Sequence, residues 1–147
     1  MKYLTLLLCL LVFAGCDKTQ QERHPNGQLS VEKTVKNGEL HGLYREWYDN
    51  GQLSVERGYR KGERHGLQRE WYENGQLSKE YNCVKGSREG TLRFWYEDGM
   101  LNQEGNFKND QQHGHQQWWD YAGNLVAEEY YENGEVVVPW DNGTGSW

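Results

Sequence analysis

Apolar and polar residues alternate along most of the chain, and the same alternation returns at a fixed interval. The string EWYDNGQLSVE at 46–56 precedes EWYENGQLSKE at 70–80 by 24 residues, and FWYEDGMLNQE at 94–104 is a looser third copy. Short alternating segments rich in Tyr, Trp, Leu and Val, separated by glycines, predict β-strands of about five to seven residues. Because one period holds two such segments, we expect two strands in each repeat.

Glycine is placed regularly within this 24-residue register. Three columns hold the recurring glycines: Gly27, Gly51, Gly75, Gly99 and Gly123; Gly38, Gly62, Gly86 and Gly134, with Asp110 in the remaining place; and Gly42, Gly66, Gly90 and Gly114. Glycines at such spacing predict tight turns with positive backbone φ angles. The pairs Asn50-Gly51, Asn74-Gly75 and Asp98-Gly99 are typical of two-residue hairpin turns. Ala122-Gly123 fits that turn badly, which predicts another geometry for the last hairpin.

Two-residue turns at the first glycine column would fix the register of the strands on either side. The expected opposite pairs are Tyr48 with Leu53, Trp47 with Ser54 and Arg45 with Glu56, and by the same arithmetic Arg69 with Glu80 and Arg93 with Glu104. In this register two further columns lie on opposite faces of the sheet. They are the leucines 29, 53, 77, 101 and 125, and the glutamates 32, 56, 80, 104 and 128.

These elements predict an all-β fold, an elongated single-sheet stack of antiparallel β-hairpins with 24 residues in each repeat. We expect the repeat domain to span residues 24–135 and a C-terminal capping segment to span 136–147. Since Pro139 cannot donate a hydrogen bond to a neighbouring strand, residues 135–140 are expected to close the sheet as an edge strand. Whether the last residues form a cap or a truncated further repeat stays open.

The N-terminal residues predict an export signal. A charged start precedes an apolar run that ends at Phe13 and is too short to span a bilayer stably. The sequence Phe13-Ala14-Gly15-Cys16 also resembles the lipobox of bacterial lipoproteins, in which the cysteine is acylated and becomes the new N-terminus. We therefore expect a signal peptide over 1–15, lipidation of Cys16, and a polar tether over 16–23. An ordinary cleaved signal with an incidental Cys16 is the alternative.

The charge of the chain excludes some partners. Its 16 basic and 22 acidic residues give a net charge of −6. An acidic chain lacks the positive footprint that nucleic acid binding requires, and it has no general attraction to anionic lipid headgroups. Contact with a membrane should therefore come through the acyl chain on Cys16.

The three cysteines predict no intramolecular disulfide bond. Cys9 leaves with the signal peptide and Cys16 is expected to be acylated, so Cys83 has no partner. In the repeat register Cys83 shares a column with Val35, Tyr59, Phe107 and Tyr131. This column predicts a packed strand residue rather than a reactive thiol.

Candidate catalytic and metal-binding residues are better explained as parts of the scaffold. His41, His65 and His113 share a column, but equivalent residues roughly 10 Å apart cannot bridge one ion with bonds of about 2 Å, so turn chemistry explains them better. His113 and His115 lack a third ligand. The glutamate column could supply paired acids for hydrolysis, but the arginines opposite it predict cross-strand ion pairs. We expect no enzymatic activity, no metal and no cofactor.

Aromatic columns are the most informative surface feature. Tryptophan recurs once per repeat, at Trp47, Trp71, Trp95 and Trp119. Tyrosine follows it at Tyr48, Tyr72 and Tyr96, on the opposite face in the expected register. A single sheet cannot bury both faces, so at least one aromatic row should be partly exposed, and exposed aromatic stripes mark binding surfaces. We assign the Trp row as the expected partner surface and the Tyr row as sheet packing.

The repeat resembles a known family. The residues ERGYRKGERHGL at 56–67 are similar to a MORN repeat, and WYENGQL at 71–77 resembles the bacterial MORN-variant repeat of proteins labelled as antitoxins of toxin–antitoxin systems. This resemblance covers residues 24 to 135. It implies a module of antiparallel hairpins used for protein contacts, and it does not imply that this chain is an antitoxin.

Together these features predict a lipid-anchored, non-enzymatic protein of the bacterial cell envelope, facing the periplasm or the exterior, whose repeats hold a protein partner. One version is an immunity role in which the partner is a toxin. The alternative is recognition of a cell-envelope glycan, since rows of aromatic rings stack on sugars. A homo-oligomer formed through the open sheet edges is a third hypothesis. The identity of the partner, and the membrane and leaflet, stay open.

Overall fold

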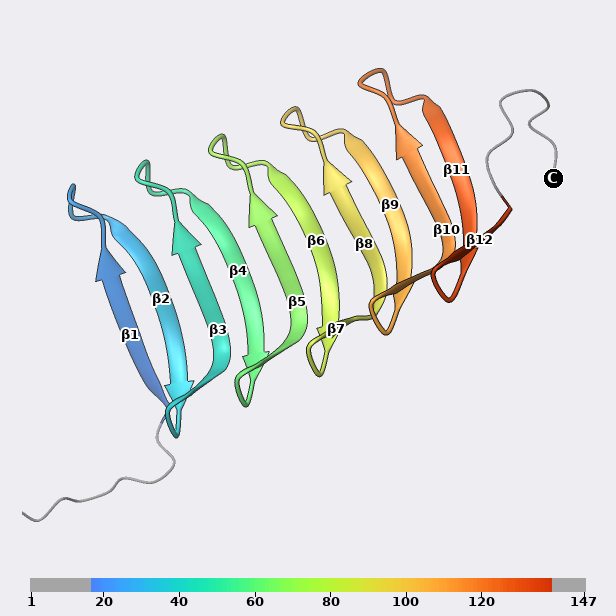
Figure 1. Cartoon of the computed structure of the whole chain (residues 1–147). Coiled ribbons are helices and arrows are strands. Elements are labelled where there is room, and N and C mark those ends of the chain that lie inside the picture. Colours follow the sequence, from blue (N-terminus) through green and yellow to red (C-terminus); the bar gives the residue numbers. More distant parts are fainter. Residues whose placement is uncertain (1–16, 139–147) are drawn as a thin grey trace, which may run out of the picture.

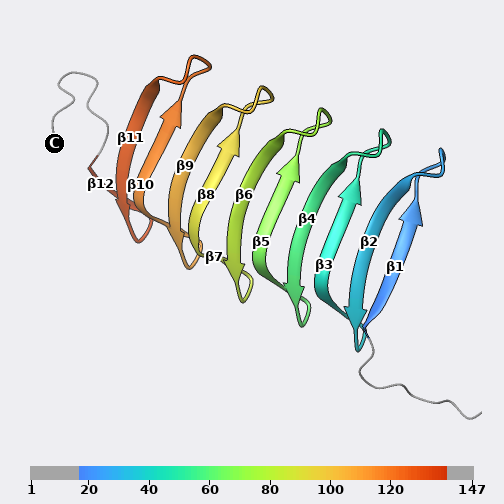
Figure 2. The ribbon, with the colours of Figure 1, turned by 180° about the vertical axis from the view of Figure 1, so that it is seen from behind.

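The computed structural model describes residues 17–138, which form one open antiparallel sheet without helices. Figure 1 and the opposite view in Figure 2 show the strands side by side in a long ribbon that no second layer covers on either face. The predicted all-β single sheet is confirmed. No helix of the described chain is long and apolar enough to cross a membrane.

The sheet follows the chain order almost throughout. Its strands are β1 (Lys18–Arg23), β2 (Leu29–Lys36), β3 (Glu39–Trp47), β4 (Leu53–Arg60), β5 (Glu63–Trp71), β6 (Leu77–Val84), β7 (Ser87–Arg88), β8 (Gly90–Trp95), β9 (Leu101–Lys108), β10 (Gln111–Trp119), β11 (Leu125–Glu132) and β12 (Glu135–Val138). Each pairs with its chain neighbours, except that β7 pairs with β6 only and β6 continues to β8. Two strands per repeat are therefore confirmed.

The turns of the first glycine column contain three residues, so the expected two-residue turns are wrong. Tyr48 N–H donates to Gln52 O at 2.9 Å, and Gly51 N–H donates to Tyr48 O at 3.0 Å, with Gly51 at φ 84°. This is the three-residue hairpin in which a type I turn is followed by a left-handed glycine. The hairpin that contains Gly123 makes the same two hydrogen bonds, so the separate geometry expected there is also wrong.

True two-residue turns connect the strands at their opposite ends, along the other long edge of the sheet. They contain the glycines of the second column. Lys61 and Gly62, for example, have φ angles of 53° and 77°. Two successive positive φ angles define the turn type whose twist matches that of the flanking strands. The equivalent pairs are Asn37 with Gly38, Lys85 with Gly86, Asn109 with Asp110, and Asn133 with Gly134.

The third glycine column marks irregularities inside strands, and the tight turns expected there are wrong. Gly66 has the expected positive φ, 80°, but it lies within β5 where the register with β4 jumps between Arg57 and Tyr59. The amide of the buried Gln68 donates to Gly58 O at 3.1 Å and to Gly66 O at 3.0 Å. The bulge thus has a polar side chain that satisfies its free carbonyl groups.

The longer turn changes which residues share a face. Trp47 opposes Leu53 and not Ser54, because the register shifts by one residue after Glu46 and Val55. Since paired residues point to the same side, the leucine column lies on the face of the tryptophans and the glutamates. The expected separation of leucines and glutamates onto opposite faces is wrong. We call this side the Trp face, defined by Trp47, Trp71, Trp95 and Trp119.

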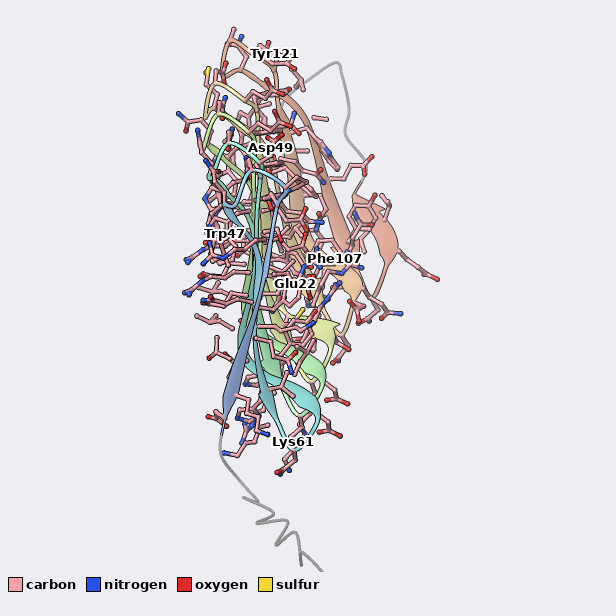
Figure 3. All side chains as sticks on the ribbon, turned by 90° about the vertical axis from the view of Figure 1, so that its left-hand side faces the viewer. Glu22, Trp47, Asp49, Lys61, Phe107 and Tyr121 are labelled. Atoms are coloured by element: carbon pink, nitrogen blue, oxygen red, sulfur yellow. The ribbon has the colours of Figure 1, made fainter. Side chains whose placement is uncertain are left out.

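The other side, which we call the hollow face, carries the small core. Tyr81, Cys83 and Leu92 are buried there, with Phe94 and Phe107 packed against them. Viewed along the sheet, Trp47 and Phe107 lie on opposite sides of the ribbon (Figure 3). The prediction that Cys83 is a packed strand residue is confirmed.

Tyrosine side chains join successive repeats. The hydroxyls of Tyr48, Tyr72 and Tyr96 donate to the backbone oxygens of Trp71, Trp95 and Trp119, at 2.6, 2.7 and 2.8 Å. In the first repeat His24 Nε2 is 2.7 Å from Trp47 O, so a histidine replaces the tyrosine there. The Tyr row is therefore part of the scaffold, as predicted.

The ends of the described chain are strands. Residues 18–23 were expected to belong to a tether, but they form β1 because the backbone of β2 offers free hydrogen-bonding groups along that edge. β12 is the opposite edge strand, as predicted for this part of the C-terminal segment. The expected signal peptide, Cys16, and residues 139–147 lie outside the described residues.

Replacing Tyr72 with Phe should lower the free energy of unfolding by about 1 kcal/mol, because it removes one hydrogen bond between repeats and leaves Trp95 O without that donor. Urea unfolding followed by circular dichroism measures the change. Tyr121→Phe is the matched control, since Tyr121 is 71% exposed. Equal stability of Tyr72→Phe and the wild type would contradict a role of this hydroxyl in joining repeats.

Candidate functional site

A ladder of ion pairs runs along the middle of the Trp face. The Nε atoms of Arg45, Arg69 and Arg93 lie 2.8, 2.7 and 2.6 Å from carboxylate oxygens of Glu56, Glu80 and Glu104. The predicted cross-strand pairs are thus confirmed. Because these side chains remain 20–41% exposed, each pair contributes only about 0.2–1 kcal/mol.

The ladder also connects neighbouring hairpins and ends in neutral residues. Arg69 Nη1 reaches Glu56 of the preceding hairpin at 3.8 Å. At the two ends, Gln21 donates to Glu32 at 2.7 Å and Gln117 donates to Glu128 at 2.9 Å. These carboxylates are therefore engaged by partners across the sheet, and none is placed as one of two free acids around a substrate bond.

An apolar row lies beside this ladder. Each tryptophan opposes a leucine across its hairpin, in the pairs Trp47 with Leu53, Trp71 with Leu77, Trp95 with Leu101 and Trp119 with Leu125. All four tryptophans are half-buried. On the same face, Leu43 and Leu67 are 42% and 47% exposed, so the apolar surface is widest over the second and third repeats. The assignment of the Trp row as a partner surface stays a prediction.

The histidine column does not converge on one point. His41, His65 and His113 lie in three different strands, each directly before a glycine with positive φ, and not in turns as expected. His115 Nδ1 is 2.8 Å from Glu128 Oε1. Within residues 17–138 no three His, Cys, Asp or Glu side chains are grouped to hold a metal ion.

The hollow face contains a depression of about 250 Å³ over β5 to β8 and the turn after β9, and we call it the hollow. Tyr81, Cys83 and Leu92 form its buried floor, and Phe94 extends the floor on one side. Its rim is charged, formed by Arg64, Lys79, Arg88 and Asp110. An apolar floor with a few charged groups at its rim is a common composition for a ligand site.

The charged groups of the rim differ in their contacts: one arginine has a carboxylate partner, whereas Lys79 and Arg64 contact aromatic side chains. Arg88 pairs with Asp110 at 3.0 Å, and its guanidinium lies 4.4 Å from the centre of the Phe107 ring. Lys79 Nζ lies over the rings of Tyr81 and Phe94, at 5.1 and 5.2 Å. Arg64 Nη1 is 3.3 Å from the Tyr81 hydroxyl.

Burial and hydrogen bonding shift several pKa values around the hollow. Burial raises the pKa of the Cys83 thiol and that of the Tyr81 phenol, so both groups are neutral at pH 7. Hydrogen bonds from the backbone N–H and the side chain of Arg88 lower the pKa of Asp110, which keeps it ionised. Elsewhere on this face, a hydrogen bond to Glu46 raises the pKa of Tyr44 to about 12.

Sequence reasoning did not find the hollow, although the repeat register contained a signal. Three of its residues differ in type from the equivalent residues of the preceding repeat. In the repeat register the columns of this face vary: Lys79 stands with Val31, Val55, Gln103 and Ala127, Leu92 with Tyr44, Gln68 and Gln116, and Phe94 with Glu46, Glu70 and Trp118. This variation could not be read as one site, because these columns also vary elsewhere and the sequence does not show that residues of β6 and β8 enclose a depression.

Charge differs between the two long edges of the sheet. The three-residue turns contain Asp49, Glu73, Glu97, Asp98 and Asp120, and no Lys or Arg among residues 48–52, 72–76, 96–100 and 120–124. At the other long edge, the first four two-residue turns and their flanking residues carry more basic than acidic side chains. The basic ones are Lys36, Arg60, Lys61, Lys85 and Lys108, and the acidic ones are Glu39, Glu63 and Asp110. The first described residue, Asp17, lies at this basic edge, 3.4 Å from Lys36 Nζ.

Comparisons with known proteins match the repeat. A family model described as "MORN repeat variant" matches residues 17–37, 40–61, 64–82, 88–109 and 112–133. No curated protein matches the sequence. A solved structure titled "Crystal structure of accessory secretory protein 1,2 and 3 in Streptococcus pneumoniae" aligns with a TM-score of 0.40 and 14% identity over 70% of this chain. The alignment spans 19% of that chain's length.

Cys83 should react with a thiol reagent at least about 100 times more slowly in the folded protein than in denaturant, because burial holds the thiol protonated and only the thiolate attacks. Absorbance from Ellman's reagent measures the rate, and Cys83→Ser identifies the signal from this residue. Rapid labelling of Cys83 in the folded protein would show that the floor of the hollow opens.

Proposed function

The chain belongs to the MORN repeat variant family, and on that premise we propose that it is a lipid-anchored, non-enzymatic protein of the bacterial cell envelope whose repeats hold a protein partner. Membership of this family supports a role for the repeats in protein–protein or membrane binding. The observation that carries the proposal is the half-buried Trp–Leu row on a sheet face without a second layer. Such a face offers a large rigid contact area.

The partner surface is centred on the second and third repeats. There the exposed Leu43 and Leu67 lie on the same face as Trp47 and Trp71. The ion-pair ladder runs between these apolar positions, so its polar atoms are already hydrogen-bonded when the surface is covered. Apolar contact area with internally satisfied polar groups is typical of protein interfaces.

The arrangement of the described acids supports a non-enzymatic role. Glu56, Glu80 and Glu104 are engaged by arginines, and the Cys83 thiol is buried with a raised pKa. A catalytic carboxylate or thiol needs access to substrate and a pKa suited to its task. The acidic charge of the chain gives no support to nucleic acid binding.

The anchor rests on the lipobox-like sequence before Cys16, and the sheet adds an orientation. Asp17 follows that cysteine directly and lies at the basic edge, close to Lys36. An acyl chain on Cys16 would therefore hold this edge toward the membrane. Both faces of the sheet, and the acidic turns at the far edge, would stay open to a partner in the periplasm or the exterior.

An immunity role, with a toxin as the partner, rests on the family resemblance alone. Glycan binding is the second candidate, and it is favoured by the same observation, because a row of half-buried tryptophans can stack on sugar rings as well as on protein side chains. The two candidates predict different ligands for one surface.

Replacing Trp71 and Trp95 with Ala should weaken partner binding at least about tenfold, since interface tryptophans carry a large share of binding energy. The wild-type protein is purified from detergent-extracted membranes with its bound proteins, and the recovered partner is then titrated with each variant. Tyr121→Ala is the control, because this exposed ring lies outside the row. Circular dichroism verifies that each variant folds.

Sedimentation with purified peptidoglycan separates the two candidates. Unchanged recovery of the protein partner by the Trp71→Ala and Trp95→Ala variants would contradict the proposed surface. Sedimentation of the wild type that is lost in both variants would favour glycan recognition.

Labelled palmitate should be incorporated into the wild-type protein and not into Cys16→Ser, because the cysteine is the proposed acylation site. Autoradiography of the immunoprecipitated protein measures the label. A wild-type protein without label would overturn the anchor while leaving the partner surface untouched.

A further inference from the structure

The two faces of the sheet repeat to different degrees. On the Trp face the same residue types return in register, as in the ladder and the Trp–Leu row. On the hollow face the strand columns change from repeat to repeat, and Lys79, Leu92 and Phe94 lie around one depression. Positions that the scaffold does not need are free to serve recognition, as in other repeat proteins with a shared framework.

The exchange at position 92 creates the floor of the hollow. In the preceding repeat, the Gln68 amide occupies this column and donates to two bulge carbonyl groups. Leu92 cannot donate, and it packs instead with Tyr81 and Cys83 at 4% exposure. The fourth repeat therefore offers an apolar floor where the third has a hydrogen-bonded amide.

Two positive charges at the rim have no carboxylate partner within the described residues. Asp110 neutralises Arg88, but neither Arg64 nor Lys79 forms a salt bridge there. Glu70 lies directly across from Lys79 in the sheet and pairs with Arg57 at 3.5 Å instead. In a chain of net charge −6, the rim of the hollow thus carries an excess of two positive charges.

We propose that the hollow binds an extended segment of a partner polypeptide that presents a carboxylate and an aromatic ring on the same side. The carboxylate binds between Arg64 and Lys79, where the Tyr81 hydroxyl can also donate to it, and the ring packs on Leu92 and Phe94. Charge-assisted hydrogen bonds to a partly desolvated carboxylate are strong, and alternate residues of an extended chain point to the same side. The ligand motif is therefore an acid and an aromatic residue separated by one position.

This site is independent of the proposed Trp surface, because it lies on the other face. The Trp row supplies contact area in successive repeats, whereas the hollow is formed by residues of the third and fourth repeats and selects by charge and shape. Such charged recognition chiefly gives specificity.

Peptide titration followed by NMR tests the site in the full-length protein. The probe is acetyl-Gly-Asp-Gly-Phe-Gly-amide, and its analogues carry Asn in place of Asp or Ala in place of Phe. The Asp–Phe peptide should bind saturably and shift the backbone amides of Leu92 and Phe94. The Asn analogue should bind at least about tenfold more weakly, and the Ala analogue should also lose affinity.

Matched lysine variants separate this site from general attraction to positive charge. Lys79→Gln should weaken binding of the probe at least about tenfold, and Lys79→Arg should retain it. Lys33→Gln should leave binding unchanged, because this lysine lies on the same face but is paired with Glu22. Trp71→Ala should also leave it unchanged.

Three results would overturn the proposal. One is the absence of saturable binding. Another is equal binding of the Asp and Asn peptides. The third is a set of shifted amides on the Trp face, in which case the peptide binds to the row of the proposed function.

Discussion

Hydrogen bonding between neighbouring strands is the constraint on which the rest of the structure depends, because within residues 17–138 no second layer covers the sheet. Only Tyr81, Cys83 and Leu92 are buried hydrophobic residues among those described, so burial of apolar surface is concentrated in one small cluster. Stability must come from pairs of adjacent strands and from side chains that join one repeat to the next. The ion-pair ladder and the tyrosine hydroxyls serve this purpose, and both recur every 24 residues because the strands do.

This constraint also explains how scaffold and recognition divide between the faces. Residues that join strands and repeats return in successive repeats, which accounts for the regular ion-pair ladder and the regular tyrosine row. On the hollow face the residue types at Lys79, Leu92 and Phe94 differ from those of the preceding repeat while the strands keep their register. A regular Trp–Leu row on one face and a charged hollow on the other make the protein suitable for broad contact on one side and selective contact on the other.

The repeat period allowed much of the fold to be predicted. The pairing of Arg45 with Glu56 was predicted correctly because two differences from the assumed hairpin cancel. The turn contains one residue more than assumed, and the one-residue register shift beside it restores the expected pairing. The pairing of Trp47 was missed for the same reason, since the shift falls between Glu46 and Trp47. The strand at Lys18–Arg23 was missed because its polar composition carries no pattern and its partner strand alone makes it extended. The Trp row was identified from its spacing, whereas the hollow was not.

The sequence by itself determined the period, the number of strands per repeat, the ion pairs and the packed position of Cys83, because each follows from residue types at a fixed spacing. Only the tertiary structure decided the turn class, the sharing of a face by the leucines and glutamates, and the meeting of Lys79, Leu92 and Phe94 in one hollow. The physical reason is that side chains alternate with a period of two along a strand, so one extra residue in a turn or bulge moves every later side chain of that strand to the opposite face. Such a residue leaves little trace in the sequence.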